Sequence, residues 1–348
     1  MHKIRGTMKT ILAFETSCDD TAVALVYDNG AIIAECTYSQ TKEHAPYAGV
    51  VPEIGSRAHI EQILAVTKAV FFKAALSPTD VDYVAATFAP GLLGPLLVGA
   101  QFAKGFSVAL GVPLVAVHHM EGHLFAGLSE KGFPSPPFLS LIVSGGHTAL
   151  YHCQEDYRIE LISQTLDDAA GEAFDKIGRV LGFGYPAGKI IDEYAASGNA
   201  SRFTLPVALR EPGNLNFSFS GLKTSALNIV RELGKPDTQT LQDFCASLCH
   251  AVAQALSLKA LAACKAYGLS KIVVGGGVAA NEVLRHMLRT MCFEQGVELF
   301  LPDKKHCTDN AVMIARAAII KINQGKLSNL MTDVCANVPV SCIDELYK

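Results

Sequence analysis

Both halves of the chain open in the same way, with an apolar strand, a short loop of small polar residues and a returning strand. The first copy covers residues 11–15, 16–21 and 22–27, and the second covers residues 138–143, 144–147 and 148–153. A third strand is expected after each copy, at residues 31–36 and 158–163. Such an internal duplication predicts two similar α/β lobes. Chance recurrence of three-strand openings is the alternative, and topology alone does not decide between the two.

A Pro-rich stretch at residues 133–137 separates the two halves. Before it, the periodicity adds a helix from about Ser56, a strand, a second helix and a last strand, in the order β-β-β-α-β-α-β. A length of 348 residues suits about two domains. We therefore expect an N-terminal α/β lobe over residues 8–132, a C-terminal α/β lobe over residues 138–324 and a tail over residues 325–348.

Composition excludes several classes of protein. Hydrophobic residues make up 50% of the chain and charged residues 18%, so general disorder is excluded. The net charge of −4 argues against a protein that coats nucleic acid, although a local basic face is compatible with it. The apolar run over residues 98–117 is interrupted by polar residues, Gly and Pro, so we expect no membrane span, which needs about 18 apolar residues. The N-terminus lacks a signal-peptide pattern, Met8 is a possible natural start, and a cytoplasmic location is expected.

The ten cysteines include no CxxC pair, and several lie in apolar runs. Reduced thiols that pack as small core residues are the expected state in a chain of this kind. Cys245, Cys249 and His250 form the one group that resembles a metal cluster, but they lie within a helical pattern. We therefore favour core packing for them.

Three loops of small residues follow apolar strands, at residues 16–21, 144–148 and 275–277. Glycine lets the backbone approach an anion closely, and loops at the carboxyl ends of strands are common nucleotide sites in α/β sheets. Each loop alone is equally well explained as a tight turn. Together, in two lobes with facing strand-loop-strand elements, they predict a nucleotide cleft.

Two histidines in the segment from Val117 to His123 have the spacing of metal ligands. His119 and His123 are four residues apart, so on a helix they share one face and can bind one ion. Glu121 is not placed as in the HExxH motif of zinc proteases, which argues against a peptidase base. Asp309, before the helical run 312–320, is the candidate third ligand for Zn²⁺ or Fe²⁺. The alternatives are histidines that cap and pair, and a helix N-cap at Thr308 or Asp309.

A carboxylate-rich helix is expected near residues 167–176. Asp168, Glu172 and Asp175 would lie on one side of it, where like charges repel. This clustering suggests contacts with hydroxyl or amine groups in a cleft, and a solvated charged face is the alternative.

Six ordered motifs resemble the TsaD branch of the Kae/TsaD/Qri family, and the resemblance runs from about Met8 to about Gln324. It implies the actin/hexokinase/heat-shock-ATPase fold and transfer of threonylcarbamoyl from threonylcarbamoyl-AMP to the tRNA adenosine beside the anticodon. The motifs are Glu15–Thr21, His118–His123, Val143–Thr148, Gly171–Lys176, Phe217–Thr224 and Thr308–Asn310.

The resemblance also implies the site residues. The metal ligands fall on His119, His123 and Asp309, and the adenylate-binding residues fall on Val143, Ser144, Gly145, Gly146, His147, Asp175, Gly188, Asp192 and Asn281. The chain departs from the family pattern at Ala187 and Lys189, where the family has Gly and Pro, and at Asp20, where it has Glu.

The implied chemistry needs a base that accepts a proton from the adenosine amine, and Asp19 in the first loop is the candidate. The cofactor is one divalent metal, with Fe²⁺ the first choice and Zn²⁺ the alternative. Implied partners are tRNA, a TsaB-like paralogue and a TsaE-like ATPase. Lys176, Arg179, Lys189 and Lys223 are candidate tRNA contacts, although Phe217 and Phe219 alternate like a buried strand near Lys223. A metallopeptidase and a non-catalytic nucleotide-binding scaffold are the competing functions.

Overall fold

The computed structural model describes residues 8–47, 49–127, 134–209, 211, 213–340 and 342. The chain forms two compact units. One comprises Met1–Phe133 together with Asp309–Lys348, and the other comprises Pro134–Thr308. We describe the units separately below.

The first unit is discontinuous in sequence, which differs from the expected lobe boundaries. The predicted hinge at residues 133–137 coincides with the first boundary, but the chain returns to the first unit at Asp309 rather than ending the second lobe at residue 324. The returning helix α10 (Ala311–Asn323) is almost wholly buried against strands of the first unit. An apolar helix pattern shows that a helix is buried but not which sheet buries it, so the sequence could not place it.

The first unit is built on a five-stranded sheet with the order β3-β2-β1-β4-β5. β2 is antiparallel to β1 and β3, whereas β1, β4 and β5 run parallel. The strands are β1 (Thr10–Glu15), β2 (Asp20–Tyr27), β3 (Ile32–Ser39), β4 (Tyr83–Ala89) and β5 (Leu114–His118).

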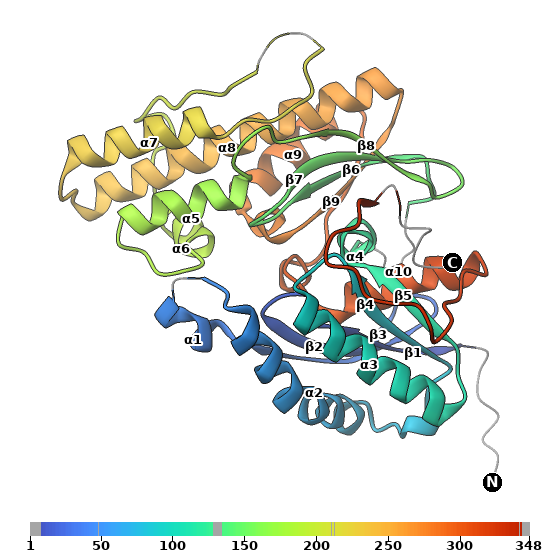
Figure 1. Ribbon diagram of the computed structural model, residues 1–348. Helices are drawn as coiled ribbons and strands as arrows, with labels where there is room; N and C mark the ends of the chain where they lie inside the picture. Colours follow the sequence, from blue (N-terminus) through green and yellow to red (C-terminus); the bar gives the residue numbers. More distant parts are fainter. Residues whose placement is uncertain are drawn as a thin grey trace. The chain divides into compact units, whose positions relative to one another are not determined.

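Helices cover both faces of this sheet. Every residue of β1 is buried, as expected for a central strand with both faces covered. The helices α2 (Pro52–Ala74) and α3 (Leu93–Leu110) pack side by side on one face, and α10 packs across the other face beside α4 (His119–Phe125) (Figure 1). Short helical turns complete the unit: α1 (Thr41–His44), η1 (Ala45–Tyr47) and η2 (Pro78–Asp80).

The second unit repeats the same sheet, which confirms the predicted duplication. Its strand order β8-β7-β6-β9-β10 matches that of the first sheet strand for strand, with the same parallel and antiparallel pairings. Its strands are β6 (Phe138–Val143), β7 (Thr148–Cys153), β8 (Ile159–Gln164), β9 (Lys271–Gly275) and β10 (Glu298–Phe300). The last strand was not anticipated, because three residues carry no periodicity.

The core of the second unit is organised around the 30-residue helix α8 (Thr238–Tyr267). It contacts the sheet and also the helices on either side of it. The remaining elements are α5 (Ala170–Val180), α6 (Gly188–Ala195), α7 (Ser220–Leu233), η3 (Gly277–Ala280), α9 (Glu282–Glu294) and η4 (Lys304–His306).

Two helices, α3 and α8, are long and apolar enough to cross a membrane by length and composition alone. This criterion tolerates the polar residues that interrupt both helices, such as Gln101 and Lys104 in α3. For α8, 83% of the apolar window is buried inside the protein, as in the core helix of a soluble domain. For α3 the buried share is 33%, and this helix packs on β4 and α2.

The turn after β9 requires glycine at position 276. Gly276 has φ +90° and ψ 159°, a conformation that is essentially restricted to glycine. A Cβ atom there would lie 2.3 Å from the carbonyl oxygen of Val143 at the end of the neighbouring strand β6. The turn therefore lies directly against the backbone of β6.

We expect Gly276→Ala to destabilise the protein strongly. Gly268→Ala is the matched control, because Gly268 also has a positive φ (+65°) but open space around its Cα. The control should cost about 1–2 kcal/mol in free energy of unfolding, and Gly276→Ala a further ~1–3 kcal/mol for the backbone clash. Denaturant unfolding measures both values, and equal losses would contradict the close approach.

Candidate metal centre and active site

The two candidate histidine ligands lie on a short helix at the end of β5. α4 begins at His119, and the side chain of His118 caps it by accepting a hydrogen bond from the backbone N–H of Met120. The other ring nitrogen of His118 donates to the carbonyl of Val338, so the C-terminal segment holds this cap in place. His119 and His123 are one turn apart, with ring centroids separated by 4.8 Å.

Asp309 completes the group of three, all within the first unit. Its Oδ1 lies 3.4 Å from Nε2 of His119 and 3.2 Å from Nε2 of His123. The N-cap of α10 is Asn310, whose side chain accepts from the N–H of Met313, so neither Thr308 nor Asp309 is the cap. The carboxylate of Asp309 is thereby left to face the two imidazoles.

Close packing fixes α4 against α10. A Cβ atom on Gly122 would lie 2.9 Å from Ile314 and 3.0 Å from Met313, so the helices approach more closely there than a side chain allows. Glu121 forms a buried ion pair with Lys321 of α10. Glu121 is thus engaged elsewhere, which confirms that it is not placed as a peptidase base.

The electrostatics of the three residues are strongly coupled. Burial opposes charge on His119, but the carboxylates of Asp309 and Glu15 outweigh it and raise the pKa of His119 well above its usual value. Burial likewise raises the pKa of Asp309, yet the neighbouring His119 and His123 hold it well below its usual range.

These residues fit a divalent metal ion. Two imidazole nitrogens and a carboxylate oxygen lie within 4.8 Å of one another, and this is a donor set of nitrogen and oxygen that suits Fe²⁺ or Zn²⁺. His123 is 3% exposed and Asp309 30%, so the site is enclosed on one side and accessible on the other. Open coordination positions are what catalytic metal sites need.

The loop after β1 brings further carboxylates near this centre. Burial raises the pKa of Asp20 to about 7, and the charges of Asp19, Asp309 and Glu15 contribute to the rise. One oxygen of Asp20, Oδ1, is buried and has no hydrogen-bond partner in the described structure. Asp20 is therefore a half-satisfied acid within the electrostatic field of Glu15 and Asp309.

In the second unit, the predicted adenylate loop forms a tight turn between β6 and β7. The N–H of Ser144 donates to the carbonyl of His147, and the hydroxyl of Ser144 accepts from the N–H of His147. Gly145 and Gly146 are exposed and have open space where a Cβ would be. Gly171 of α5 packs so close that a Cβ there would lie 2.6 Å from the carbonyl oxygen of Ser144, a constraint that the sequence analysis missed.

Asp175 supports the segment that precedes α6. Its Oδ1 accepts a 2.8 Å hydrogen bond from the N–H of Ala187, while burial raises the pKa of this carboxyl. Ala187 has φ −85° and ψ −18°, an ordinary helical conformation, and its methyl group is buried against Gly178. The departure from glycine at position 187 therefore does not distort the backbone before Gly188.

Asp192 and Asn281 contact each other directly. Asn281 donates to Oδ1 of Asp192 at 2.7 Å, and Asp192 also accepts from the N–H of Glu282. The amide oxygen of Asn281 caps α9 by accepting from the N–H of Leu284. The structure thus joins two residues that are 89 positions apart in the sequence.

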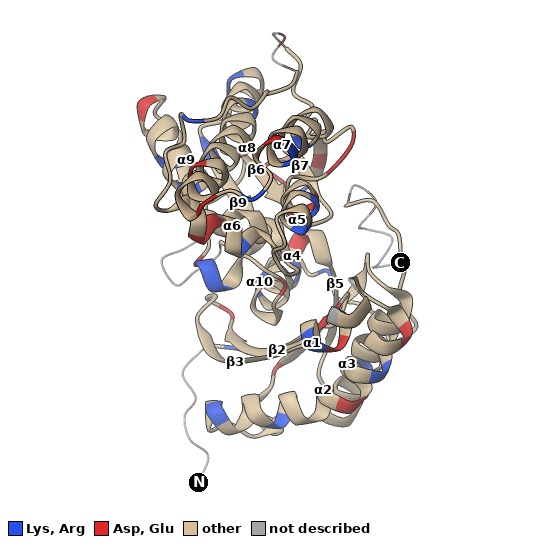
Figure 2. Ribbon diagram, turned by 90° about the vertical axis from the view of Figure 1, so that its left-hand side faces the viewer, with Lys and Arg blue, Asp and Glu red and all other residues tan. Residues whose placement is uncertain are grey.

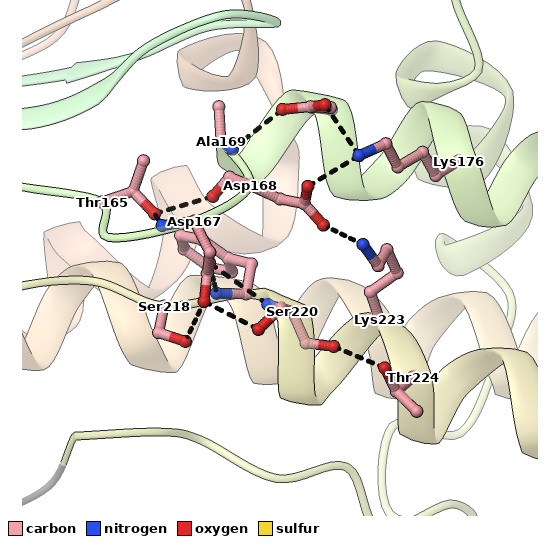
Figure 3. A network of polar contacts seen from close by, with 11 residues as sticks. Thr165, Asp167, Asp168, Ala169, Lys176, Ser218, Ser220, Lys223 and Thr224 are labelled. Atoms are coloured by element: carbon pink, nitrogen blue, oxygen red, sulfur yellow. Dashed lines mark hydrogen bonds and ion pairs between the residues drawn. The ribbon is translucent and has the colours of Figure 1, made fainter.

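The expected one-sided carboxylate helix is not what the structure shows. Asp168 precedes α5 and bridges Lys176 and Lys223, while Glu172 pairs with Lys176 (Figure 3). The repulsion predicted from spacing is therefore relieved by lysines, one of them from α7. Lysines from distant sequence could not be assigned as partners without the fold.

Asp167 is a residue that sequence reasoning missed. It accepts hydrogen bonds from the hydroxyl groups of Ser218 and Ser220 and from the N–H groups of Phe219 and Ser220, and so caps α7 (Figure 3). Phe217 and Phe219 are buried, which confirms the structural interpretation of this segment. A pair of serines before a helix was the available signal.

Core packing is confirmed for Cys245 and Cys249. Both are buried within α8, and burial raises the pKa of each thiol. His250 is exposed and does not join them. Within the described residues, His119, His123 and Asp309 are the group found with metal-ligand geometry.

The fold and these sites define a class of protein, namely two duplicated α/β units of the actin, hexokinase and heat-shock ATPase type with a metal-ligand triad in the first. Solved structures support the fold. HypF from T. kodakarensis aligns with a TM-score of 0.58 at 15% identity, covering 91% of this chain and 48% of that one. Component A of (R)-2-hydroxyglutaryl-CoA dehydratase from Acidaminococcus fermentans aligns with a TM-score of 0.53 at 14% identity, covering 90% and 99%.

The sequence profile of TsaD, described as tRNA N6-adenosine threonylcarbamoyltransferase, matches residues 31–316. The transferase of that name from Nostoc sp. is 44% identical over 98% of this chain and 100% of its own length. The one from Trichlorobacter lovleyi is 44% identical over 95% and 96%. The chain belongs to the TsaD family and is a tRNA N6-adenosine threonylcarbamoyltransferase, which confirms the resemblance and function predicted from the motifs.

We expect His119→Ala and His123→Ala each to lose the bound metal, because two remaining ligands hold a divalent ion poorly. Cys245→Ser and Cys249→Ser are the controls and should retain it. Elemental analysis of anaerobically purified proteins measures the metal-to-protein ratio. An unchanged ratio in both histidine variants would contradict the assignment of His119 and His123 as metal ligands. Loss of metal in the cysteine variants would indicate that the metal binds at α8 instead.

The raised pKa of Asp20 predicts a pH dependence of stability. The folded carboxyl keeps its proton up to about pH 7, whereas the unfolded chain loses it near pH 3.9. Between these values the folded state binds more protons, so the free energy of unfolding falls as pH rises. Asp20→Asn should flatten this decline in metal-free protein, as measured by urea unfolding across the window. Parallel curves for parent and variant would contradict the assignment.

Proposed function

We propose that the donor is threonylcarbamoyl-AMP and that the acceptor is the exocyclic amine of the tRNA adenosine beside the anticodon. Family membership supports the transfer to adenosine N6. Three features of the second unit support an adenylate as the leaving group of the donor. They are the turn that contains Gly145 and Gly146, the carboxylate of Asp175 and the contact between Asp192 and Asn281.

The proposed step is one substitution at the carbamoyl carbon. The adenosine nitrogen forms a bond to this carbon while the bond from the carbon to the phosphate oxygen breaks. AMP leaves with the electron pair of that bond, and the nitrogen loses one proton. No protein nucleophile is required, which agrees with the burial that raises the thiol pKa of Cys18 in the first loop.

The proposed adenylate-binding residues are those of the second unit that the family motifs imply. Ser144, Gly145, Gly146 and His147 offer an exposed turn whose backbone an anion can approach. Asp175 holds the segment before Gly188, and Asp192 and Asn281 present polar groups at the start of α9. Val143 ends the strand that carries the turn.

We propose Fe²⁺ as the metal at His119, His123 and Asp309, with Zn²⁺ as the alternative, because nitrogen and carboxylate donors suit both. When bound, a divalent metal supplies Lewis-acid stabilisation of the charge that develops on a carbonyl or phosphate oxygen. His119 and His123 on α4, which packs against α10, would hold the ion together with Asp309.

Asp19 is the proposed acceptor of the amine proton. Its charge and that of Asp309 both act on Cys18 and on Asp20, so the first loop and the metal ligands share one electrostatic environment. A carboxylate near the metal centre can accept a proton as the amine nitrogen becomes acidic during attack.

For tRNA binding, the structure distinguishes among the four candidate cations. Lys176 and Lys223 are both held by the carboxylate of Asp168. Lys189 makes a longer, 3.9 Å contact with Glu193 and is 86% exposed, and Arg179 is also exposed. Acidic and basic residues are interspersed over each unit (Figure 2). We propose Lys189 and Arg179 as the phosphate contacts, with binding that weakens as salt rises.

A TsaB-like paralogue and a TsaE-like ATPase are the proposed protein partners, and the cytoplasm is the proposed location. Several apolar side chains on α2 and α3 are exposed and offer contacts for such a protein. They are Ile60, Leu64, Phe72, Leu93, Leu97 and Val108.

The decisive experiment is reconstitution of the modification. The protein is incubated with its partners, threonine, bicarbonate, ATP, an adenylate-forming synthase and tRNA, and the tRNA nucleosides are analysed by mass spectrometry. We expect a threonylcarbamoyl adduct on adenosine. Its absence with active partners would contradict the proposed donor and acceptor.

Asp19→Asn should lower the transfer rate by about 10²–10⁴-fold, as expected when a general base is lost. Binding of an adenylate analogue, measured by calorimetry, should be unchanged. Asp28→Asn, in a turn of the same unit, is the control and should transfer at the parental rate. A parental rate in Asp19→Asn would remove Asp19 from the mechanism.

A further inference from the structure

Glu15, the last residue of β1, is buried, with 1% of the residue exposed. Both oxygens of its carboxylate have hydrogen-bond partners. Its Oε1 accepts a 2.5 Å hydrogen bond from the backbone N–H of Ser17. Its Oε2 accepts from the hydroxyl of Thr87 on β4 at 2.5 Å and lies 3.2 Å from Nδ1 of His119 on α4. Three separate elements of the first unit therefore meet at one carboxylate.

We propose that Glu15 is a positioning residue that sets the ring orientation and the tautomer of His119 for metal binding. The proposal rests on the metal site at His119, His123 and Asp309 and adds a residue to that site. A carboxylate without a proton can only accept, so its contact with His119 requires the proton to be on Nδ1. In the neutral ring, which is the form that binds a metal, the lone pair then lies on Nε2, the atom on the side of Asp309.

The hydroxyl of Ser17 does not change this conclusion. Its Oγ lies 3.1 Å from the same Nδ1 and can accept from the same N–H group. A hydroxyl accommodates either tautomer because it can donate or accept, whereas the carboxylate accommodates only one. Glu15 therefore decides the tautomer, and Ser17 follows it.

Glu15 is not itself positioned as a ligand. It contacts the Nδ1 side of His119, whereas the ligand atoms converge on the Nε2 side. His123 differs, since its Nδ1 is buried without a hydrogen-bond partner in the described part of the chain. Of the two histidines, His119 is therefore the one whose Nδ1 a carboxylate can orient.

Glu15→Gln keeps the shape of the side chain and removes the fixed acceptor. If the amide NH₂ faces His119, Nδ1 must accept, and the proton moves to Nε2, where it blocks metal binding. If the NH₂ faces Ser17 instead, it points at the backbone N–H of Ser17, and these two donors have no acceptor between them. Either orientation disturbs the hydrogen bonds that orient His119. We therefore expect the affinity for Co²⁺ to fall about 10–100-fold, the usual loss when the hydrogen-bond partner of a metal-ligating histidine is removed.

The measurement is the Kd for Co²⁺ in metal-free full-length protein, by competition with a chelator, together with the visible spectrum of the Co²⁺ complex. Glu121→Gln is the matched control, because Glu121 is also a buried carboxylate of this unit but pairs with Lys321. We expect it to lower the melting temperature while keeping the parental Kd and spectrum. Thr87→Val, which removes one hydrogen bond to Glu15, should weaken Co²⁺ binding less than Glu15→Gln does and provides a second variant if Glu15→Gln does not fold.

A parental Kd and spectrum in Glu15→Gln, or in Thr87→Val if only that variant folds, would overturn the proposal. An equal loss in Glu121→Gln would also overturn it, because loosening of α4 would then explain the effect. Failure of the transfer assay with intact Co²⁺ binding would contradict the proposed reaction and leave this inference standing. If Co²⁺ binding does not depend on His119 and His123, the metal site on which this inference rests is absent.

Discussion

The packing of α10 against α4 is the contact on which the metal centre depends. Asp309 is far in sequence from His119 and His123. It reaches them only because the chain returns to the first unit. Gly122 permits the close approach of the two helices, and the side chains of Met313 and Ile314 on α10 pack against it. A triad assembled in this way is maintained by core packing, so its geometry needs no mobile loop.

The two units show how one sheet topology carries two loops of different composition. In each, a loop joins the central strand to the antiparallel strand beside it. The loop after β1 carries acidic side chains and lies in the electrostatic environment of the metal ligands, whereas the loop after β6 carries glycines and exposes its backbone. The sheet supplies the position in both cases, and the loop sequence supplies the function.

Much of this arrangement was predictable from the sequence, and the failures have physical causes. Local patterns predicted the strands, the duplication and the i,i+4 histidines, because these depend on short-range periodicity. The placement of α10 and the Asp168–Lys223 pair depended on contacts between distant segments, which no local pattern specifies. The roles of Asp19 and of the adenylate-binding residues remain predictions, because they depend on where a substrate lies and not on a local pattern.

The discontinuity of the first unit has a consequence for the order in which the protein is synthesised. A ribosome completes the whole of Pro134–Thr308 before it adds Asp309 and α10. The second unit can therefore fold as a contiguous domain while the first sheet still lacks α10. During this interval the apolar residues of β1 and β2 that α10 will cover are open to chaperones, and metal can be captured at the triad only after the return segment has emerged.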